Sequence, residues 1–182
     1  MIINLPNGLT ALRVLLTPMV VLFLLRGDFS WALIVFVLAG ITDALDGFLA
    51  RSLRERTEFG RILDPVADKL LLGASLFTLG VVERLPFWLP VMAIGRDLVL
   101  MVGSCILYAT SGRLGYPPST TGKLTTGLQI LTVLVAMMGA EGSARLDPLI
   151  WGTAIATILS GLDYCYRGAV EIISRLRNTS PA

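Results

Sequence analysis

Six long apolar windows dominate this chain of 182 residues and limit the folds open to it. They run approximately over Leu9–Leu25, Trp31–Ala50, Pro65–Val82, Phe87–Thr110, Leu124–Gly139 and Leu149–Gly168. A helix needs about 20 mostly apolar residues to cross a hydrocarbon layer about 30 Å thick. Only 15% of the residues are charged, against about a quarter in soluble domains. The windows predict an all-α membrane protein with six transmembrane helices, and residues 1–182 are expected to form one domain without a soluble appendage.

Basic residues are distributed unevenly over the connections between these windows. The first, third and fifth connections carry Arg26, Arg84 and Arg145. The second and fourth connections and the C-terminal tail carry the larger group, which is Arg51, Arg54, Arg56, Arg61, Arg113, Lys123, Arg167, Arg175 and Arg177. The positive-inside rule assigns the more basic side to the cytoplasm. Both termini are therefore expected to be cytoplasmic in a multi-pass protein of a bacterial inner or plasma membrane, and no cleavable signal peptide is expected at the N-terminus.

The chain contains no histidine, which narrows the chemistry available to it. A Ser-His-Asp triad and any His-ligated metal site are excluded. The two cysteines, Cys105 and Cys165, fall inside predicted helices, where a buried thiol usually behaves as a small hydrophobic group. Any reaction must therefore use carboxylates, hydroxyls, lysine or arginine.

Four aspartates stand at the facing ends of the second and third apolar windows. Asp43 and Asp46 lie near the end of one window, and Asp64 and Asp68 lie at the start of the next. An ionisable residue inside a span costs roughly 2.5–3.5 kcal/mol, so it suggests a function. At about 100° per residue, Asp43 and Asp46 share one helical face, while Asp64 and Asp68 are one turn apart. Four converging carboxylates would bind a hard cation such as Mg²⁺, Mn²⁺ or Ca²⁺.

The residues between these aspartates suit a substrate that contains a diphosphate. Gly47 and Gly60 permit close approach of a backbone, and Arg51 offers a forked donor to a phosphate. Single residues could also have simpler structural roles: Asp64 as the cap of a helix that begins at Pro65, Gly47 as a helix-packing residue, and Lys69 as the partner of Asp68. Such roles do not account for the whole set together, which favours a functional site.

The aspartates belong to a longer pattern, Asp43-x2-Asp46-Gly47-x2-Ala50-Arg51-x8-Gly60-x3-Asp64-x3-Asp68. This pattern resembles, without any departure, the signature of the CDP-alcohol phosphotransferase family. The resemblance implies that the four aspartates hold one or two Mg²⁺ or Mn²⁺ ions and that Asp68 is also the general base. It further implies that the pocket for the CDP part of a CDP-linked lipid is shaped by Gly47, Ala50, Arg51 and Gly60.

The resemblance implies an enzyme that transfers a phosphatidyl group from CDP-diacylglycerol to an alcohol. Asp68 would remove the proton of the acceptor hydroxyl, whose oxygen would attack the phosphatidyl phosphorus and expel CMP. A homodimer is also implied, with Gly95 and Gly103 as small residues at helix contacts, and no nucleic acid is expected as a partner. An ion-coupled transporter is the main alternative, although such sites usually lie near the bilayer midplane between internal repeats, and no repeat is evident here.

The acceptor alcohol must be inferred from other segments. Residues Leu5–Thr10 and Arg13 resemble the glycerol-accepting branch of the family, which holds phosphatidylglycerophosphate synthases and eukaryotic-type cardiolipin synthases. The glycerophosphate enzymes carry a Gly-Lys-x-Lys-Thr stretch, in which Thr125 replaces the second lysine in this chain. A free glycerol phosphate is more highly charged than a phosphodiester and should require more cationic donors. The absence of the second lysine therefore favours phosphatidylglycerol over glycerol 3-phosphate as the acceptor.

Three cations are predicted to contact the acceptor. Arg96 lies in the fourth window, and Arg113 and Lys123 flank a turn rich in glycine and proline. A purely structural role is open to each of them as well, because Arg96 and its neighbour Asp97 could fix helix packing and the charge bias alone could place the other two. Asp163, in the sixth window, has no role assigned from the sequence.

Overall fold

The computed structural model describes the backbone of residues 5–53, 58–111, 120–139 and 146–178, and within these the side chains of 12–42, 69–103, 120–139, 146–168 and 170. The described chain is all helical, as predicted, and it forms α1 (Leu5–Arg26), α2 (Phe29–Leu53), α3 (Glu58–Val81), α4 (Trp88–Ser111), α5 (Thr120–Met137) and α6 (Leu146–Asn178). These helices follow the order of the apolar windows. Within the described residues, no helix is both long enough and apolar enough to qualify as a membrane-spanning segment.

Two helices differ most in extent from the windows that predicted them. The third helix begins at Glu58, upstream of Asp64 and Pro65, so the interpretation of Asp64 as a helix cap is wrong. The sixth helix continues past the end of its window to Asn178. In both cases charged and polar residues interrupt the apolar ones in the added segment, so it does not appear as a continuous apolar window. Helix formation depends on backbone hydrogen bonds, which polar residues also make.

The turn between α1 and α2 is built around a glycine with positive φ. Gly27 has a φ of 80°. Its backbone N–H donates to the carbonyl of Leu24 at 3.1 Å, and the N–H of Asp28 donates to the carbonyl of Phe23 at 2.9 Å. This pair of hydrogen bonds is the Schellman arrangement, which satisfies the last carbonyls of a helix. It lets α2 start at Phe29 and return along α1.

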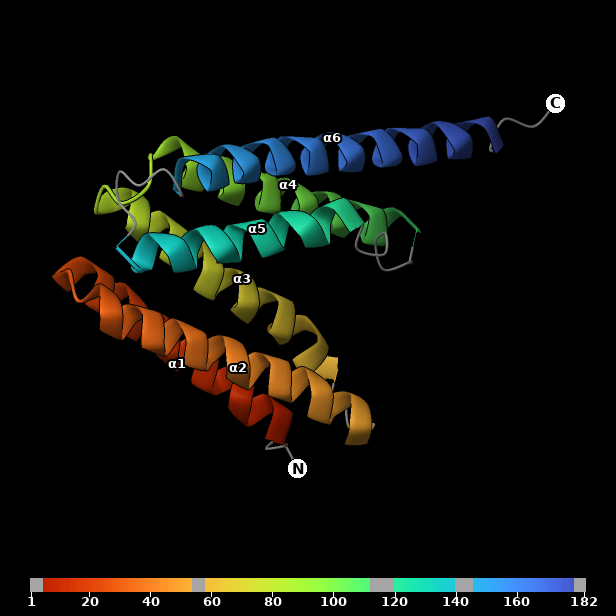
Figure 1. The fold of residues 1–182 in the computed structure, drawn as a ribbon. Coiled ribbons are helices and arrows are strands. Elements are labelled where there is room, and N and C mark those ends of the chain that lie inside the picture. The colour runs from red at the N-terminus through yellow and green to blue at the C-terminus, as the bar shows by residue number, and fades with distance from the viewer. Residues whose placement is uncertain (1–4, 54–57, 112–119, 140–145, 179–182) are drawn as a thin grey trace.

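The helices form two groups that meet at α3. Figure 1 shows α1 and α2 side by side, with α4, α5 and α6 gathered on the other side of α3. The third helix packs against α1 on one side and against α4 and α5 on the other. One apolar cluster joins both groups, and its members include Leu24, Ala32, Leu76, Leu89, Val133 and Ala154. The third helix therefore provides most of the packing between the two groups, and α2 adds a smaller contact with α5.

Many of the buried side chains in the interior are polar. Thr132 and Thr153 share a hydrogen bond of 2.8 Å between α5 and α6. Other hydroxyls donate to a carbonyl one turn earlier in their own helix, as Ser75, Thr78, Thr125 and Thr157 do. Buried hydroxyls need such partners, because an unpaired polar group in an apolar interior is costly.

Candidate active site

The predicted metal ligands occupy two helices that are consecutive in the chain. Asp43 and Asp46 belong to the C-terminal half of α2, and Asp64 and Asp68 to the N-terminal half of α3. Figure 1 shows the C-terminal end of α2 and the N-terminal end of α3 at the same end of the molecule. The backbone is helical at all four positions. Asp43 and Asp46 therefore share one face of α2, and Asp64 and Asp68 are one turn apart on α3, as their spacing predicted.

The side chains of these four aspartates lie outside the described residues, as do those of Gly47, Ala50, Arg51 and Gly60. Arg113 lies outside them as well. Among the side chains that the structure describes, no group of three or more acidic or cysteine residues could hold a metal ion. The metal site and the CDP pocket therefore stay predictions.

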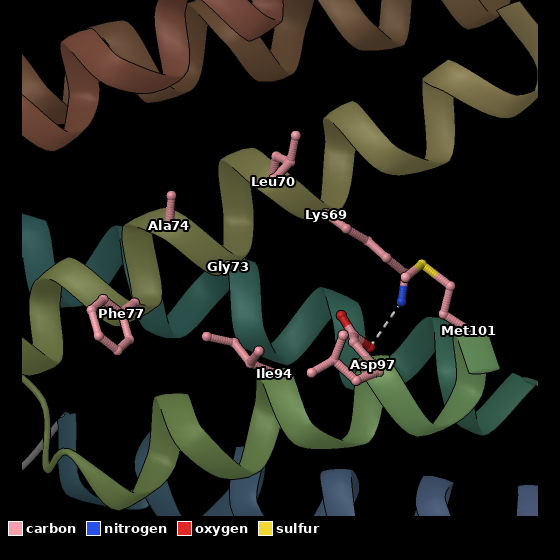
Figure 2. Close-up of a pocket in the computed structure, with 9 residues that line it drawn as sticks. Lys69, Leu70, Gly73, Ala74, Phe77, Ile94, Asp97 and Met101 are labelled. Carbon is pink, nitrogen blue, oxygen red and sulfur yellow. Dashed lines mark ion pairs between the residues drawn. The ribbon is translucent and has the colours of Figure 1, made fainter.

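The described side chains of α3 begin with Lys69, which directly follows Asp68. Its Nζ atom lies 3.0 Å from the Oδ1 atom of Asp97 on α4, as Figure 2 shows. The guanidinium of Arg96 donates to the same carboxylate oxygen at 2.7 Å, and its other terminal nitrogen donates to the hydroxyl of Ser160 on α6. A continuous series of polar contacts therefore joins α3, α4 and α6.

These contacts bear on the predicted role of Arg96. Its side chain is only 8% exposed. Its two terminal nitrogens bind Asp97 and Ser160, and within the described residues its Nε atom has no acceptor. This is the arrangement expected if Arg96 and Asp97 fix helix packing, and its contact with the acceptor stays a prediction. The sequence also did not indicate that Lys69 pairs with Asp97, because that contact joins two helices.

Asp163, which had no role from the sequence, connects α5 with α6. The hydroxyl of Thr121 donates to its Oδ2 atom at 3.0 Å, and Nε of Arg167 donates to its Oδ1 atom at 2.8 Å. The spacing of four residues between Asp163 and Arg167 is a signal that could have identified this pair. The carboxylate holds the start of α5 against α6, close in the chain to Lys123, which is exposed.

Thr125 occupies the position at which the glycerophosphate enzymes are expected to carry a second lysine. It is fully buried. Its hydroxyl lies 2.9 Å from the carbonyl oxygen of Thr121 and 3.0 Å from that of Ala156 on α6. This side chain is therefore committed to the contact between α5 and α6, and it brings no charge to the adjacent end of the molecule.

Comparison with known proteins gives a consistent result over nearly the whole chain. Residues 3–161 match the CDP-alcohol phosphatidyltransferase family. The chain is 34% identical to a probable phosphatidylglycerophosphate synthase of Mycobacterium tuberculosis, over 98% of this chain and 88% of that protein. It is 33% identical to a probable CMP-forming cardiolipin synthase of Drosophila melanogaster, over 90% of this chain and 57% of that protein.

A relative from Rickettsia bellii, named CDP-diacylglycerol–glycerol-3-phosphate 3-phosphatidyltransferase, is 32% identical over 88% of this chain and 93% of its own length. Together with the family match, these relatives cover the helices that carry the aspartates and those that pack against them. The chain belongs to the CDP-alcohol phosphatidyltransferase family of enzymes.

Proposed function

We propose that this enzyme transfers the phosphatidyl group of CDP-diacylglycerol to a hydroxyl of phosphatidylglycerol, which yields cardiolipin and CMP. The observation that carries the proposal is the complete family pattern from Asp43 to Asp68, placed on two consecutive helices whose ends lie together. The names of the relatives support CDP-diacylglycerol as donor and a glycerol-type hydroxyl as acceptor.

The proposed site consists of carboxylates from α2 and α3. Asp43, Asp46, Asp64 and Asp68 would hold one or two Mg²⁺ or Mn²⁺ ions, for which a set of oxygen donors without histidine or thiolate is suited. The bound cation would neutralise charge on the pyrophosphate. Arg51 donates hydrogen bonds to a phosphate, and Gly47, Ala50 and Gly60 leave room for the nucleotide.

Asp68 acts in this proposal as the general base. It accepts the proton of the acceptor hydroxyl as the oxygen of that group attacks the phosphorus that carries the diacylglycerol. The bond from this phosphorus to the bridging oxygen breaks, and CMP leaves with the electron pair. Arg96, Arg113 and Lys123 are proposed to bind the phosphodiester of the acceptor.

The choice of phosphatidylglycerol is supported by Thr125. This residue is buried against α6 and brings no charge where the glycerophosphate enzymes are expected to carry a second lysine, and a glycerol phosphate dianion should require more cationic donors than a phosphodiester. Glycerol 3-phosphate is the second candidate. It is favoured by the names of the relatives from M. tuberculosis and R. bellii, which align over most of their own length.

We place the enzyme in a membrane, as a single domain over residues 1–182 with six spans, cytoplasmic termini and an active site on the cytoplasmic side. Large apolar side chains are exposed on every helix of the described structure, for example Leu15, Trp31, Leu70, Leu98, Leu124 and Trp151. An apolar exterior around a partly polar interior fits a lipid environment. A homodimer is part of the same proposal and rests on the family resemblance.

The proposal is tested by CMP release from purified protein in detergent with CDP-diacylglycerol and Mg²⁺ or Mn²⁺. Phosphatidylglycerol and glycerol 3-phosphate are supplied separately, and we expect release with the former. Asp68→Asn should abolish release while donor binding is retained, because the amide cannot accept the proton. Asp147→Asn, which changes an exposed aspartate of α6, is the matched control and should leave the rate unchanged.

Each alternative gives a distinct result in this assay. Release with glycerol 3-phosphate alone would transfer the assignment to the second candidate. Absence of release with either acceptor, and with inositol or serine, would contradict the proposed reaction. Full activity of Asp68→Asn would remove Asp68 from the role of base.

A further inference from the structure

The three tryptophans of the chain all lie at one end of the molecule. Trp31 is near the start of α2, Trp88 begins α4, and Trp151 is in the second turn of α6. Figure 1 shows these three helices starting at the same end, whereas α2 ends and α3 begins at the opposite end. The tryptophans therefore mark the end that faces away from the proposed active site, and we call it the tryptophan end.

The indole rings at this end are open to the surroundings. The exposed fraction is 60% for Trp31, 43% for Trp88 and 63% for Trp151. The rings of Trp88 and Trp151 contact each other, with 5.6 Å between their centroids. In the part of the chain that the structure describes, none of the three indole N–H groups donates a hydrogen bond. Each ring therefore presents an apolar face and a polar N–H to whatever surrounds the molecule.

The side chains before and after each tryptophan follow one order on all three helices. An exposed acid precedes each of them, which is Asp28, Glu83 or Asp147. Exposed aliphatic side chains follow them along the helix, for example Ile34 and Leu38 on α2, Val91 and Leu98 on α4, and Ile155 and Leu159 on α6. Charged groups, then tryptophan, then aliphatic groups is the order in which water, the headgroup layer and the hydrocarbon of a membrane follow one another.

We propose that the tryptophan end binds the headgroup layer of the lipid leaflet opposite to the active site, with the indole N–H groups donating to lipid phosphate or ester oxygens. The proposal rests on the membrane location proposed above. It adds the surface by which the molecule is held at a fixed depth in the bilayer.

The distribution of the tryptophans favours a lipid layer over a protein partner. Trp31 belongs to the helix group of α1 and α2, and the other two belong to the group on the far side of α3. A protein that docks on one group would leave the tryptophans of the other group uncovered. A membrane surface surrounds the molecule and contacts both groups at once.

This placement fixes the depth of the remaining charged residues. A hydrocarbon layer about 30 Å thick ends about 20 residues along a helix from its tryptophan. Arg51 on α2 and Arg175 and Arg177 on α6 lie at or beyond this distance. From Trp88 to Asp97 the rise is about 14 Å, so the ion pair of Lys69 and Asp97 lies near the middle of the layer.

The depth is tested by fluorescence, because the emission of the protein comes from these three tryptophans. Purified protein is placed in vesicles that contain phosphatidylcholine brominated either near the headgroup or near the end of the acyl chain. We expect the shallow bromine to quench the emission at least about twofold more strongly than the deep one. Variants that keep only Trp31 or only Trp151, with the other tryptophans changed to Phe, should give the same preference.

The leaflet is tested by labelling of a single cysteine in a background with Cys105→Ser and Cys165→Ser. Ser30→Cys places an exposed thiol beside Trp31, and Thr120→Cys, at the start of α5, is the matched control at the opposite end. A maleimide that cannot cross membranes should label Ser30→Cys at least about tenfold more than Thr120→Cys in bacterial spheroplasts, and the preference should reverse in inside-out vesicles. Elution as a single peak in detergent identifies the variants that are folded.

Several outcomes would overturn the proposal. Stronger quenching by the deep bromine would place the indole rings in the hydrocarbon, and equally weak quenching by both would place them in water. Opposite preferences for Trp31 and Trp151 would show that the two helix groups do not share one interface. Labelling of Ser30→Cys only in inside-out vesicles, or equally in both preparations, would remove the assignment to the opposite leaflet.

These measurements are independent of catalysis. If the protein releases no CMP but shows the expected quenching and labelling, the proposed reaction fails and the lipid contact of the tryptophan end stands. If it releases CMP while the quenching or labelling contradicts the expected pattern, the reaction stands and this inference fails.

Discussion

At the scale of single residues, one glycine decides how closely α4 approaches α6. A Cβ atom on Gly103 would lie 2.8 Å from Cε1 of Tyr164 and 3.0 Å from its hydroxyl oxygen. That hydroxyl donates to the carbonyl of Leu100 at 3.3 Å, so the ring cannot move without weakening this bond. Gly95, on the same helix, has nothing within 4 Å of an added Cβ. The sequence marked both glycines as helix contacts of a homodimer, which stays a prediction; within the chain, Gly103 is the one of the two in a close contact.

Gly103→Ala should therefore destabilise the protein by about 1 kcal/mol net, because overpacking outweighs the gain in helix propensity. Gly95→Ala is the matched control and should stabilise the protein by about 0.5–1 kcal/mol, since only the propensity changes. Both values come from denaturant unfolding in one detergent. Equal shifts for the two variants would show that Tyr164 does not restrict Gly103.

At the scale of helices, Asp97 is the shared partner that links α3, α4 and α6. It accepts from Lys69 and Arg96, and Arg96 in turn reaches Ser160. The exposed fraction of the side chain is 40% for Lys69 but only 8% for Arg96. The two ion pairs should therefore contribute unequally, because a buried cation depends on its partner far more than an exposed one does.

Asp97→Asn should lower the free energy of unfolding by about 2 kcal/mol, because it leaves the guanidinium of Arg96 without a counter-charge in a mostly buried position. Lys69→Gln should lower it by less than about 1 kcal/mol, since solvent screens the charge of Lys69. The two variants are compared by unfolding in the same detergent. A larger effect from Lys69→Gln would mean that the contact of α3 with α4, and not the burial of Arg96, dominates.

At the scale of the whole molecule, polar and apolar groups are not separated as in a typical soluble domain. Hydroxyls and amides such as Thr125, Gln129 and Thr153 are fully buried, while large apolar side chains face outwards on all the described helices. A lone exposed apolar residue would be unremarkable, but exposed apolar side chains on every helix form a surface that water solvates poorly.

We therefore expect the protein to stay in the membrane pellet after washing with alkaline carbonate or high salt and to enter solution only with detergent. Each large apolar side chain is stabilised by about 1.5–3 kcal/mol when it is removed from water, so many together should hold the chain in the bilayer. The test is immunoblotting of pellet and supernatant, with a peripheral membrane protein as control. Release by carbonate would contradict the proposed membrane location.

Much of the fold and the family of this protein could be predicted without a structure. The apolar windows indicated the number and order of the helices, because a helix that is apolar over its length is visible as a continuous run. The pattern from Asp43 to Asp68 indicated the family, because its positions are close together in the sequence and each requires a particular residue type. The start of α3 at Glu58 could not be seen in this way, since Glu58, Arg61 and Asp64 interrupt the apolar residues before its continuous apolar run.

The sequence by itself determined what is local: six helical segments, and a signature whose members lie within two consecutive helices. Only the tertiary structure decided which distant side chains meet. The pairing of Lys69 with Asp97, the bond from Arg96 to Ser160 and the restriction of Gly103 by Tyr164 all join different helices. The period of 3.6 residues per turn determines which face of its own helix a residue occupies. Which face of a neighbouring helix that residue contacts depends on how the whole helices pack together.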